Sequence, residues 1–219
     1  MPSLRQLITL SLLAATVNAA FGPAFSTGPT ASGVYIYSST ATLTLPNGPS
    51  GASSGYDLSL WVGMGTSDGD LIQSITDNYN EDWTVFAYTL KETSSTSQEV
   101  IEGPVAPAAA GDEVTMVYQY VASTGNYTQT VYLNGVVVST LSTSDGEAEG
   151  WGSAVECASD NCGTVPAHKW TNVEIVLSAA DPGYIDTMYL EVGAEASMST
   201  SDGGKTWNVG TISIPQYTF

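Results

Sequence analysis

The chain has 219 residues, of which 42% are hydrophobic and only 12% are charged. Four Lys and Arg residues stand against 22 Asp and Glu residues, so the formal net charge is −18. So few cations cannot neutralise a phosphate backbone or an anionic bilayer surface, and we expect neither nucleic acid nor a membrane as a partner. The low charged fraction and plentiful aliphatic residues argue against disorder.

The first 19 residues have the pattern of a secretory signal peptide. Arg5 precedes the apolar stretch Leu7–Ala15, and Val17-Asn18-Ala19 supplies the small residues of a cleavage site. The apolar stretch is too short to span a bilayer. We therefore expect a secreted, extracellular protein whose mature domain covers residues 20–219.

Export sets expectations for four side chains. Cys157 and Cys162, the two cysteines, are predicted to form one local disulfide. Two thiols and the lone His168 are too few for a closed zinc shell, so no metal is expected. Asn126-Tyr127-Thr128 is a sequon, which makes Asn126 a candidate glycosylation site.

The rest of the chain reads as strands, because short runs rich in Val, Ile, Thr, Tyr and Trp alternate with clusters of Gly, Pro, Ser and Asn. In chain order, the predicted strands are Val34–Leu45, Tyr56–Met64, Leu71–Ile75, Trp83–Leu90, Glu113–Val121, Tyr127–Leu133, Val136–Leu141, Val173–Leu177, Thr187–Val192 and Thr211–Phe219. Asn134-Gly135 predicts a two-residue hairpin turn. Thr-Ser-Asp-Gly, which ends at Gly69, Gly146 and Gly203, is interpreted as turn chemistry. Gly103–Ala110 is predicted to be a loop. The pattern predicts a single all-β domain, an antiparallel β-sandwich or jelly roll.

Several catalytic signatures do not hold up in their context. Gly51–Gly55 has the spacing of a nucleophile elbow but lies in a Pro/Ser/Gly loop instead of a strand-turn-helix. Asp68–Asp70 and Asp77–Asp82 offer oxygen ligands without the EF-hand spacing, so we interpret both as solvated loop charge. No phosphate-binding loop or dinucleotide motif is present, and no cofactor is expected.

Two polar residues on predicted strands are candidates for metal-free acid chemistry. In Val173–Leu177, period two places Glu174 beside Val176, partly apolar surroundings that would raise the pKa of its carboxyl. In Leu71–Ile75, Gln73 shares a face with apolar residues, and its neutral amide can donate a hydrogen bond to developing negative charge. The ordinary alternative is that both are solvated polar residues on half-exposed strands.

The order and spacing of several segments resemble the glutamic peptidases (eqolisins), which are fungal acid endopeptidases with a lectin-like β-sandwich. The segments that carry the resemblance are Ala41–Pro46, Leu60-Trp61-Val62-Gly63, Leu71-Ile72-Gln73-Ser74, Gly111–Val114 and Thr171-Asn172-Val173-Glu174. The resemblance implies a concanavalin-like fold and an acid endopeptidase that acts on polypeptides. Glu174 would activate a water and later protonate the leaving amine, and Gln73 would hold that water and stabilise the oxyanion.

Alternatives to this interpretation remain open. Trp83–Tyr88 lacks the acid that the family carries between aromatic residues, so a catalytically inactive relative is one alternative. Concanavalin-like sandwiches also include carbohydrate-active and carbohydrate-binding proteins. Trp61 and Trp83 are the candidate substrate-binding aromatic residues, and Glu156 or Asp186 would be the second carboxylate of a glycosidase. An amide facing Glu174 would favour peptide hydrolysis, and a second carboxylate facing it would favour glycoside hydrolysis. If neither group faces Glu174, a binding module is favoured. A monomer is expected.

Overall fold

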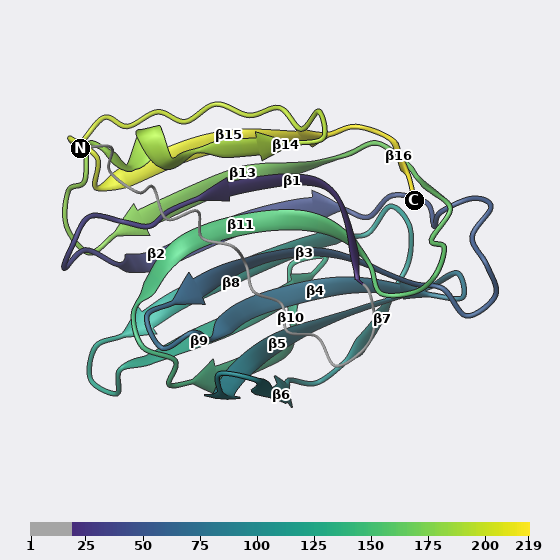
Figure 1. Cartoon of the computed structure of the whole chain (residues 1–219), viewed down its shortest axis with the longest axis horizontal. Coiled ribbons are helices and arrows are strands. Elements are labelled where there is room, and N and C mark those ends of the chain that lie inside the picture. Colours follow the sequence, from purple (N-terminus) through teal and green to yellow (C-terminus); the bar gives the residue numbers. More distant parts are fainter. Residues whose placement is uncertain (1–18) are drawn as a thin grey trace.

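The computed structural model describes residues 19–219, which form two antiparallel sheets packed face to face (Figure 1). Residues 1–18, which include most of the predicted signal peptide, lie outside the described residues. The sheet that we call sheet A has eight strands in the order β14–β1–β11–β3–β4–β5–β6, with β7 also paired to β5. Their bounds are Ala20–Thr27 for β1, Asp57–Thr66 for β3, Leu71–Tyr79 for β4, Asp82–Ser94 for β5, Ser97–Glu102 for β6, Ala106–Ala108 for β7, Ala148–Cys157 for β11 and Tyr189–Glu191 for β14.

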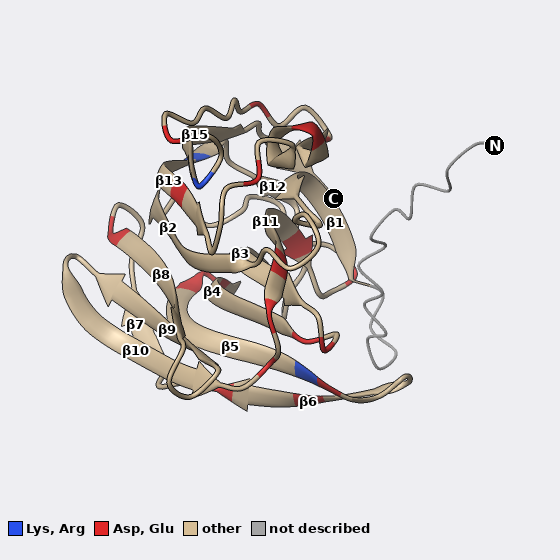
Figure 2. Ribbon diagram, turned by 90° about the vertical axis from the view of Figure 1, so that its left-hand side faces the viewer, with Lys and Arg blue, Asp and Glu red and all other residues tan. Residues whose placement is uncertain are grey.

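The second sheet, sheet B, has six strands in the order β10–β9–β8–β2–β13–β15. Their bounds are Ile36–Thr44 for β2, Glu113–Val121 for β8, Asn126–Leu133 for β9, Val136–Thr143 for β10, His168–Leu177 for β13 and Thr206–Ile214 for β15. A small third sheet pairs β12 (Thr164–Val165) with β16 (Tyr217–Thr218), and a 3-10 helix, η1, covers Tyr184–Thr187. Figure 2 shows sheets A and B as two layers.

The main hydrophobic core fills the space between the layers. Alternate residues of both sheets point into it, among them Leu60 and Ile72 from sheet A and Leu43 and Ile175 from sheet B, all fully buried. The period-two pattern therefore has the physical cause that each strand buries one face and leaves the other outside. This confirms the predicted antiparallel sandwich.

The predicted hairpin and disulfide are confirmed. Leu133 pairs with Val136, and Asn134 and Gly135 between them have φ values of 51° and 78°. Cys157 and Cys162 are disulfide-bonded and clip the loop that follows β11. No helix among residues 19–219 is long and apolar enough to cross a membrane.

Two predicted loops are partly strand. Gly103–Ala110 contains β7, which pairs with β5. The acidic segment Asp77–Asp82 belongs largely to the ends of β4 and β5, which are joined by a turn at Asn80 and Glu81. In both segments, pairing with a neighbouring strand overrides the loop preference of the local composition.

Candidate functional site

The structure does not bring Gln73 and Glu174 together. Gln73 lies on β4 of sheet A, next to the core residue Ile72, and so points to the outer face of that sheet. Glu174 lies on β13 of sheet B between Val173 and Ile175, which are both core residues, so it points out of the opposite side of the sandwich. The prediction that the two side chains share one cleft is therefore wrong, because their strands belong to different sheets and both face away from the interior.

Glu174 lines a shallow polar hollow of about 440 Å³ on the outer face of sheet B. Its direct neighbours across the ladder are Thr40 and Asn208, and a bulge at Asn172, whose φ is 53°, shifts the register beside it. An amide thus does face this carboxylate, but both Glu174 and Asn208 are exposed to water. Burial therefore does not prepare Glu174 for acid–base work.

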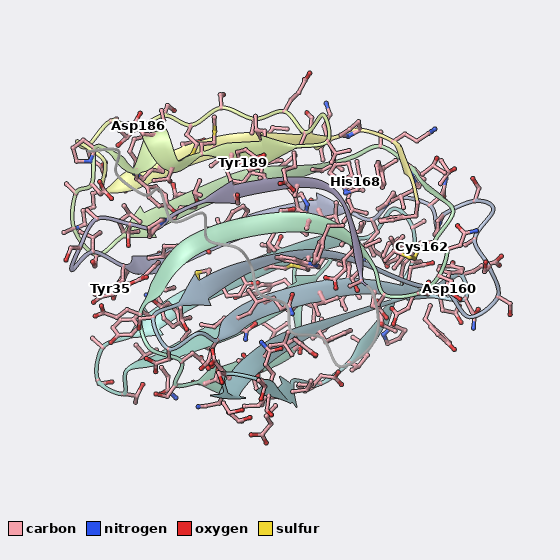
Figure 3. The ribbon with its side chains drawn as sticks, viewed as in Figure 1. Tyr35, Asp160, Cys162, His168, Asp186 and Tyr189 are labelled. Atoms are coloured by element: carbon pink, nitrogen blue, oxygen red, sulfur yellow. A yellow bond between two sulfur atoms is a disulfide. The ribbon has the colours of Figure 1, made fainter. Side chains whose placement is uncertain are left out.

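The two carboxylates considered as partners of Glu174 lie on other elements. Glu156 is on β11 of sheet A. Asp186, which is labelled in Figure 3, is in the 3-10 helix η1. Neither of the two is on a strand that pairs with β13. The arrangement of a glycosidase carboxylate pair around Glu174 is therefore not supported.

Gln73 belongs to a row of directly paired residues that crosses the outer face of sheet A, which we call the Gln73 row. The row passes in order through Tyr189, Ser26, Gly152, Gly63, Gln73, Tyr88 and Glu102. Figure 3 labels Tyr189 at one edge of this face. Directly paired residues point to the same face, so these side chains all lie on the outer surface of the sheet.

One side of Gln73 is free of side chains. Gly63 and Gly152 follow it in the row, and Gly65 and Gly150 are the paired residues of the next row on the same face. At Gly63 a Cβ would lie 2.8 Å from the Cβ of Gln73, so only glycine lets β3 and β4 approach this closely. At Gly65 a Cβ would meet nothing within 4 Å. We call these four residues the glycine strip. Glycine within strands is typical where another backbone or a ligand approaches a sheet.

The amide of Gln73 is buried without a partner. The side chain is only 5% exposed, and its Oε1 has no hydrogen-bond partner in the described part of the chain. Leaving a buried acceptor unsatisfied costs about 1–3 kcal/mol. An orphaned amide of this kind in a native structure calls for an explanation, and an absent ligand that donates a hydrogen bond is one.

An apolar tier lies next to the Gln73 row on the same face. Trp61, Ile75, Phe86 and Ala154 form a second hydrophobic cluster, separate from the main core, with Tyr88 packed against it. The ring centroids of Phe86 and Tyr88 are 6.1 Å apart. Trp61 thus lies on the outer face of sheet A, in the tier next to Gln73. Trp83 does not, because it belongs to the main core and its Nε1 donates to the carbonyl oxygen of Pro46 at 3.2 Å.

An acidic tier follows the apolar one. Asp77 pairs with Ser59, whose hydroxyl donates to Asp77 Oδ1 at 3.0 Å, and burial together with the neighbouring Asp57 carboxyl raises the pKa of Asp77 to about 7. Glu156 accepts a 2.9 Å hydrogen bond from Nε1 of Trp61, and burial raises its pKa while this bond opposes the rise. Perturbed carboxyls beside an apolar patch are typical of functional sites.

Side chains from sheet B support the Gln73 row from the core. The hydroxyl of Tyr118 accepts the N–H of Ser74 at 2.6 Å and donates to the carbonyl of Val62 at 2.6 Å. Ser74 and Val62 are a ladder pair directly beside Gln73 and Gly63. Tyr118 therefore fixes the separation of β3 and β4 at the point where the glycine strip meets the amide.

The remaining sequence-predicted residues lie away from this face or are not tested. Asn126 begins β9 and donates to Ser142 Oγ at 3.2 Å; its glycosylation stays a prediction. His168 is 7% exposed, and burial lowers its pKa. Among residues 19–219 no group of three or more His, Cys, Asp and Glu side chains has an arrangement that would hold a metal ion.

Comparison with known proteins defines the class of fold. The protein is an antiparallel β-sandwich of the glutamic-peptidase type: scytalido-glutamic peptidase with a transition-state analogue inhibitor superposes with a TM-score of 0.55 at 16% identity, covering 92% of this chain and 100% of the peptidase. The eqolisin SCP-B, solved with the tripeptide Ala-Ile-His, gives a TM-score of 0.50 at 16% identity, covering 91% of this chain and 100% of SCP-B.

Other comparisons add less. An endo-1,3-β-glucanase from Streptomyces sioyaensis gives a TM-score of 0.37 at 17% identity over 60% of this chain and 55% of the glucanase, which carries no argument about function. No protein-family model matches the sequence, and no curated protein matches it. At these identities the likeness establishes the fold alone.

Proposed function

We propose that this protein is an exported polypeptide-binding protein with a glutamic-peptidase fold, and that it holds an extended peptide on the outer face of sheet A at Gln73. The observation that carries the proposal is the buried, unpartnered amide of Gln73 beside the glycine strip. Export is supported by the signal-peptide pattern and is compatible with the disulfide.

The chemistry of Gln73 matches that of a peptide group. A carboxamide both donates and accepts, as does a peptide bond, and Oε1 lacks the donor that a peptide N–H would supply. The glycine strip lets a backbone come close to the sheet, while the Trp61 cluster lies one tier away, where an alternate side chain of an extended chain would reach it.

A saccharide ligand is less well supported. Sugar recognition uses exposed aromatic faces, but each of the five tryptophans is at most 4% exposed. Trp83, one of the two predicted platforms, faces the main core. The hollow around Glu174 is polar and is lined by no aromatic residue.

Peptide hydrolysis is the second candidate, favoured by the half-buried carboxyl of Glu156, whose pKa is raised, on the same face as Gln73. A hydrolase needs a carboxyl within reach of a water held by the amide. The residues paired with Gln73 are Gly63 and Tyr88, and the carboxylate nearest to it along the row is Glu102, two strands away. Because no carboxyl pairs directly with Gln73, binding is the primary proposal.

The test uses oxidised insulin B chain, an unfolded peptide, as the probe at pH 4–5. We expect fluorescence anisotropy to detect binding, and Gln73→Met to weaken it about three- to tenfold, the value of one hydrogen bond. Gly65→Leu adds a side chain to the glycine strip at a position where a Cβ meets nothing within 4 Å, and it should weaken binding further. Glu174→Gln, on the opposite face, is the matched control and should bind as the wild type does.

The outcomes separate the candidates. Binding that Gly65→Leu and Gln73→Met leave unchanged would overturn the proposed site, and absence of binding by the wild type would overturn the proposed function. Mass spectrometry of the same mixtures tests hydrolysis. Cleavage that is lost in Gln73→Met and in Glu156→Gln would replace the binding proposal with an enzyme that works on this face.

A further inference from the structure

Two of the three Thr-Ser-Asp-Gly turns pack against each other at one end of sheet A. One turn joins β3 to β4 and the other joins β10 to β11; of these strands, β3, β4 and β11 carry the glycine strip and Gln73. The N–H of Ser67 donates to the carbonyl of Glu147 at 2.8 Å, and the N–H of Glu147 donates to Ser67 Oγ at 3.0 Å. The turns therefore tie the ends of three site strands together.

Asp145 of the second turn and Asp70, which directly follows the first turn, are both buried carboxyls. Asp70 is 3% exposed and Asp145 is 0% exposed. The hydroxyl of Thr143 donates to Asp145 Oδ2 at 2.6 Å, and the N–H of Glu92 donates to Asp70 Oδ1 at 2.6 Å. The two carboxyl groups are adjacent, and each shifts the pKa of the other in the sense of a contact in which Asp145 carries the proton. Asp145 Oδ1 is buried and finds no donor within residues 19–219. Two ionised carboxylates have no donor to offer each other, so a proton on one of them is needed to satisfy this contact.

The charged groups around the pair are few. Lys91 and Glu92 of β5 and Asp68 of the first turn face it, while β10 offers the neutral Thr143. Nζ of Lys91 donates to the carbonyl of Ser144 at 3.0 Å and is not paired with either carboxyl. Burial raises the pKa of Asp145 to about 6, with Asp70 adding to the rise and Lys91 opposing it. Burial also raises the pKa of Asp70.

A chain of hydrogen bonds connects the pair to the back of the Gln73 row. Gln129 donates to Thr89 Oγ1 at 2.8 Å, and Thr89 Oγ1 lies 3.2 Å from Thr143 Oγ1. The hydroxyl of Thr143 is committed to Asp145, so the hydroxyl of Thr89 must donate to Thr143. Gln129 also donates to the backbone carbonyl of Tyr88 at 2.9 Å. From Gln129 the donated bonds run through Thr89 and Thr143 to Asp145, and a separate bond from Gln129 ties this chain to the backbone of Tyr88.

We propose that Asp70 and Asp145 share one proton and form an acid-dependent latch, which holds the turn end of the outer face of sheet A together in acid and loosens as the pH rises. Asp145 is the donor to Asp70 through the oxygen that otherwise lacks a partner. When both carboxyls are ionised, two buried like charges are in contact. The hydrogen-bond chain then ends at Asp145 beside a second negative charge. The consequence for peptide binding rests on the proposed function; the latch itself does not.

The sign of the pH dependence follows from the direction of the shift. The folded protein holds the proton to a higher pH than the unfolded chain does, so the latch contributes fully below about pH 4 and is lost as the pH rises through about 6. A shift from 3.8 to about 6 increases the unfolding equilibrium constant by about a hundredfold between these limits.

The test compares the wild type with Asp145→Asn by thermal unfolding from pH 4 to pH 8, without peptide. The asparagine amide donates to Asp70 at every pH and still accepts from Thr143, so we expect the two proteins to unfold at similar temperatures at pH 4. At pH 8 the variant should be the more stable, with an unfolding constant up to about a hundredfold lower than that of the wild type. Glu174→Gln removes an exposed charge and should follow the wild-type profile. Parallel profiles of wild type and Asp145→Asn would overturn the proposal.

A second measurement does not depend on how well the variant folds. Carbon-13 NMR titration of the wild-type carboxyls should show Asp145 titrating near pH 6, and titration near pH 4 would overturn the latch. Binding of insulin B chain at pH 8 then separates the two proposals. If the wild type binds in acid and Asp145→Asn retains more binding at pH 8, the latch regulates the site; a latch confirmed by stability and NMR without any peptide binding would remove the proposed function alone.

Discussion

Replacing Gln73 with methionine should make the protein more stable and worse at binding peptide. The side chain is 95% buried, since only 5% is exposed, and its Oε1 has no partner among the described residues. Methionine has nearly the same length and removes the unsatisfied acceptor, whose burial costs about 1–3 kcal/mol. We therefore expect the free energy of unfolding to rise by about 1–2 kcal/mol.

The assay is thermal unfolding at pH 5, followed by circular dichroism. For a domain of this length, 1 kcal/mol corresponds to a shift of about 2–4 °C, so the melting temperature should rise by about 2–8 °C. A gain in stability on removal of a site residue is the expected signature of a residue kept for function.

Gln129 supplies a matched control for the same substitution. It is 0% exposed, and its amide is satisfied: Nε2 donates to the carbonyl of Tyr88 at 2.9 Å and to Thr89 Oγ1 at 2.8 Å, and Oε1 accepts from Ser74 Oγ at 3.3 Å. Gln129→Met leaves these partners without their hydrogen bonds and should destabilise the protein by about 2–4 kcal/mol. If Gln73→Met destabilised the protein as Gln129→Met does, the Gln73 amide would be a structural group and the reasoning about an absent ligand would be refuted.

Three further predictions concern the surroundings of the site. Tyr118→Phe removes the hydroxyl that bridges Ser74 and Val62, so denaturant unfolding should show a loss of about 1–3 kcal/mol, and a loss below about 0.5 kcal/mol would contradict the bridge. Trp61→Phe removes the hydrogen bond that lowers the pKa of Glu156, so an NMR titration should find this carboxyl titrating at higher pH than in the wild type; a fall would count against the contact. Asp77 has a raised pKa of about 7, so it favours the folded state in acid and this contribution is lost as the pH rises through 7; Asp77→Asn should flatten the stability profile between pH 6 and pH 8, and an unchanged slope would exclude the assigned pKa.

The sequence predicts where the strands of this fold lie better than it predicts which strands pair with each other. Alternation identifies β3 and β8 with ends correct to within two residues, because each buries every second side chain against the opposite sheet. It misses β11, whose segment Ala148–Cys157 contains two glycines and two glutamates and does not look like a strand in isolation. Yet β11 supplies half of the glycine strip and Glu156.

The incorrect prediction that Glu174 shares a cleft with Gln73 also arises because the sequence does not show which strands pair. Period two correctly separates Glu174 from Val173 and Ile175, but it does not say which sheet the strand joins or which surface lies outside. That information comes from pairing between distant segments, which a single sequence does not show. The glycines are the signal that was available, because Gly63 and Gly65 alternate with core residues and leave one face of β3 bare beyond Trp61.

Mapping where a peptide binds tests whether the outer face of sheet A is the binding site. Isotope-labelled protein is titrated at pH 5 with oxidised insulin B chain, and the chemical shifts of backbone amides and of the glutamine side-chain amides are followed. We expect the largest changes at the Gln73 side-chain amide and at Gly63, Gly65 and Gly152 on the outer face of sheet A. Changes confined to Thr40, Glu174 and Asn208 on the outer face of sheet B would contradict this expectation.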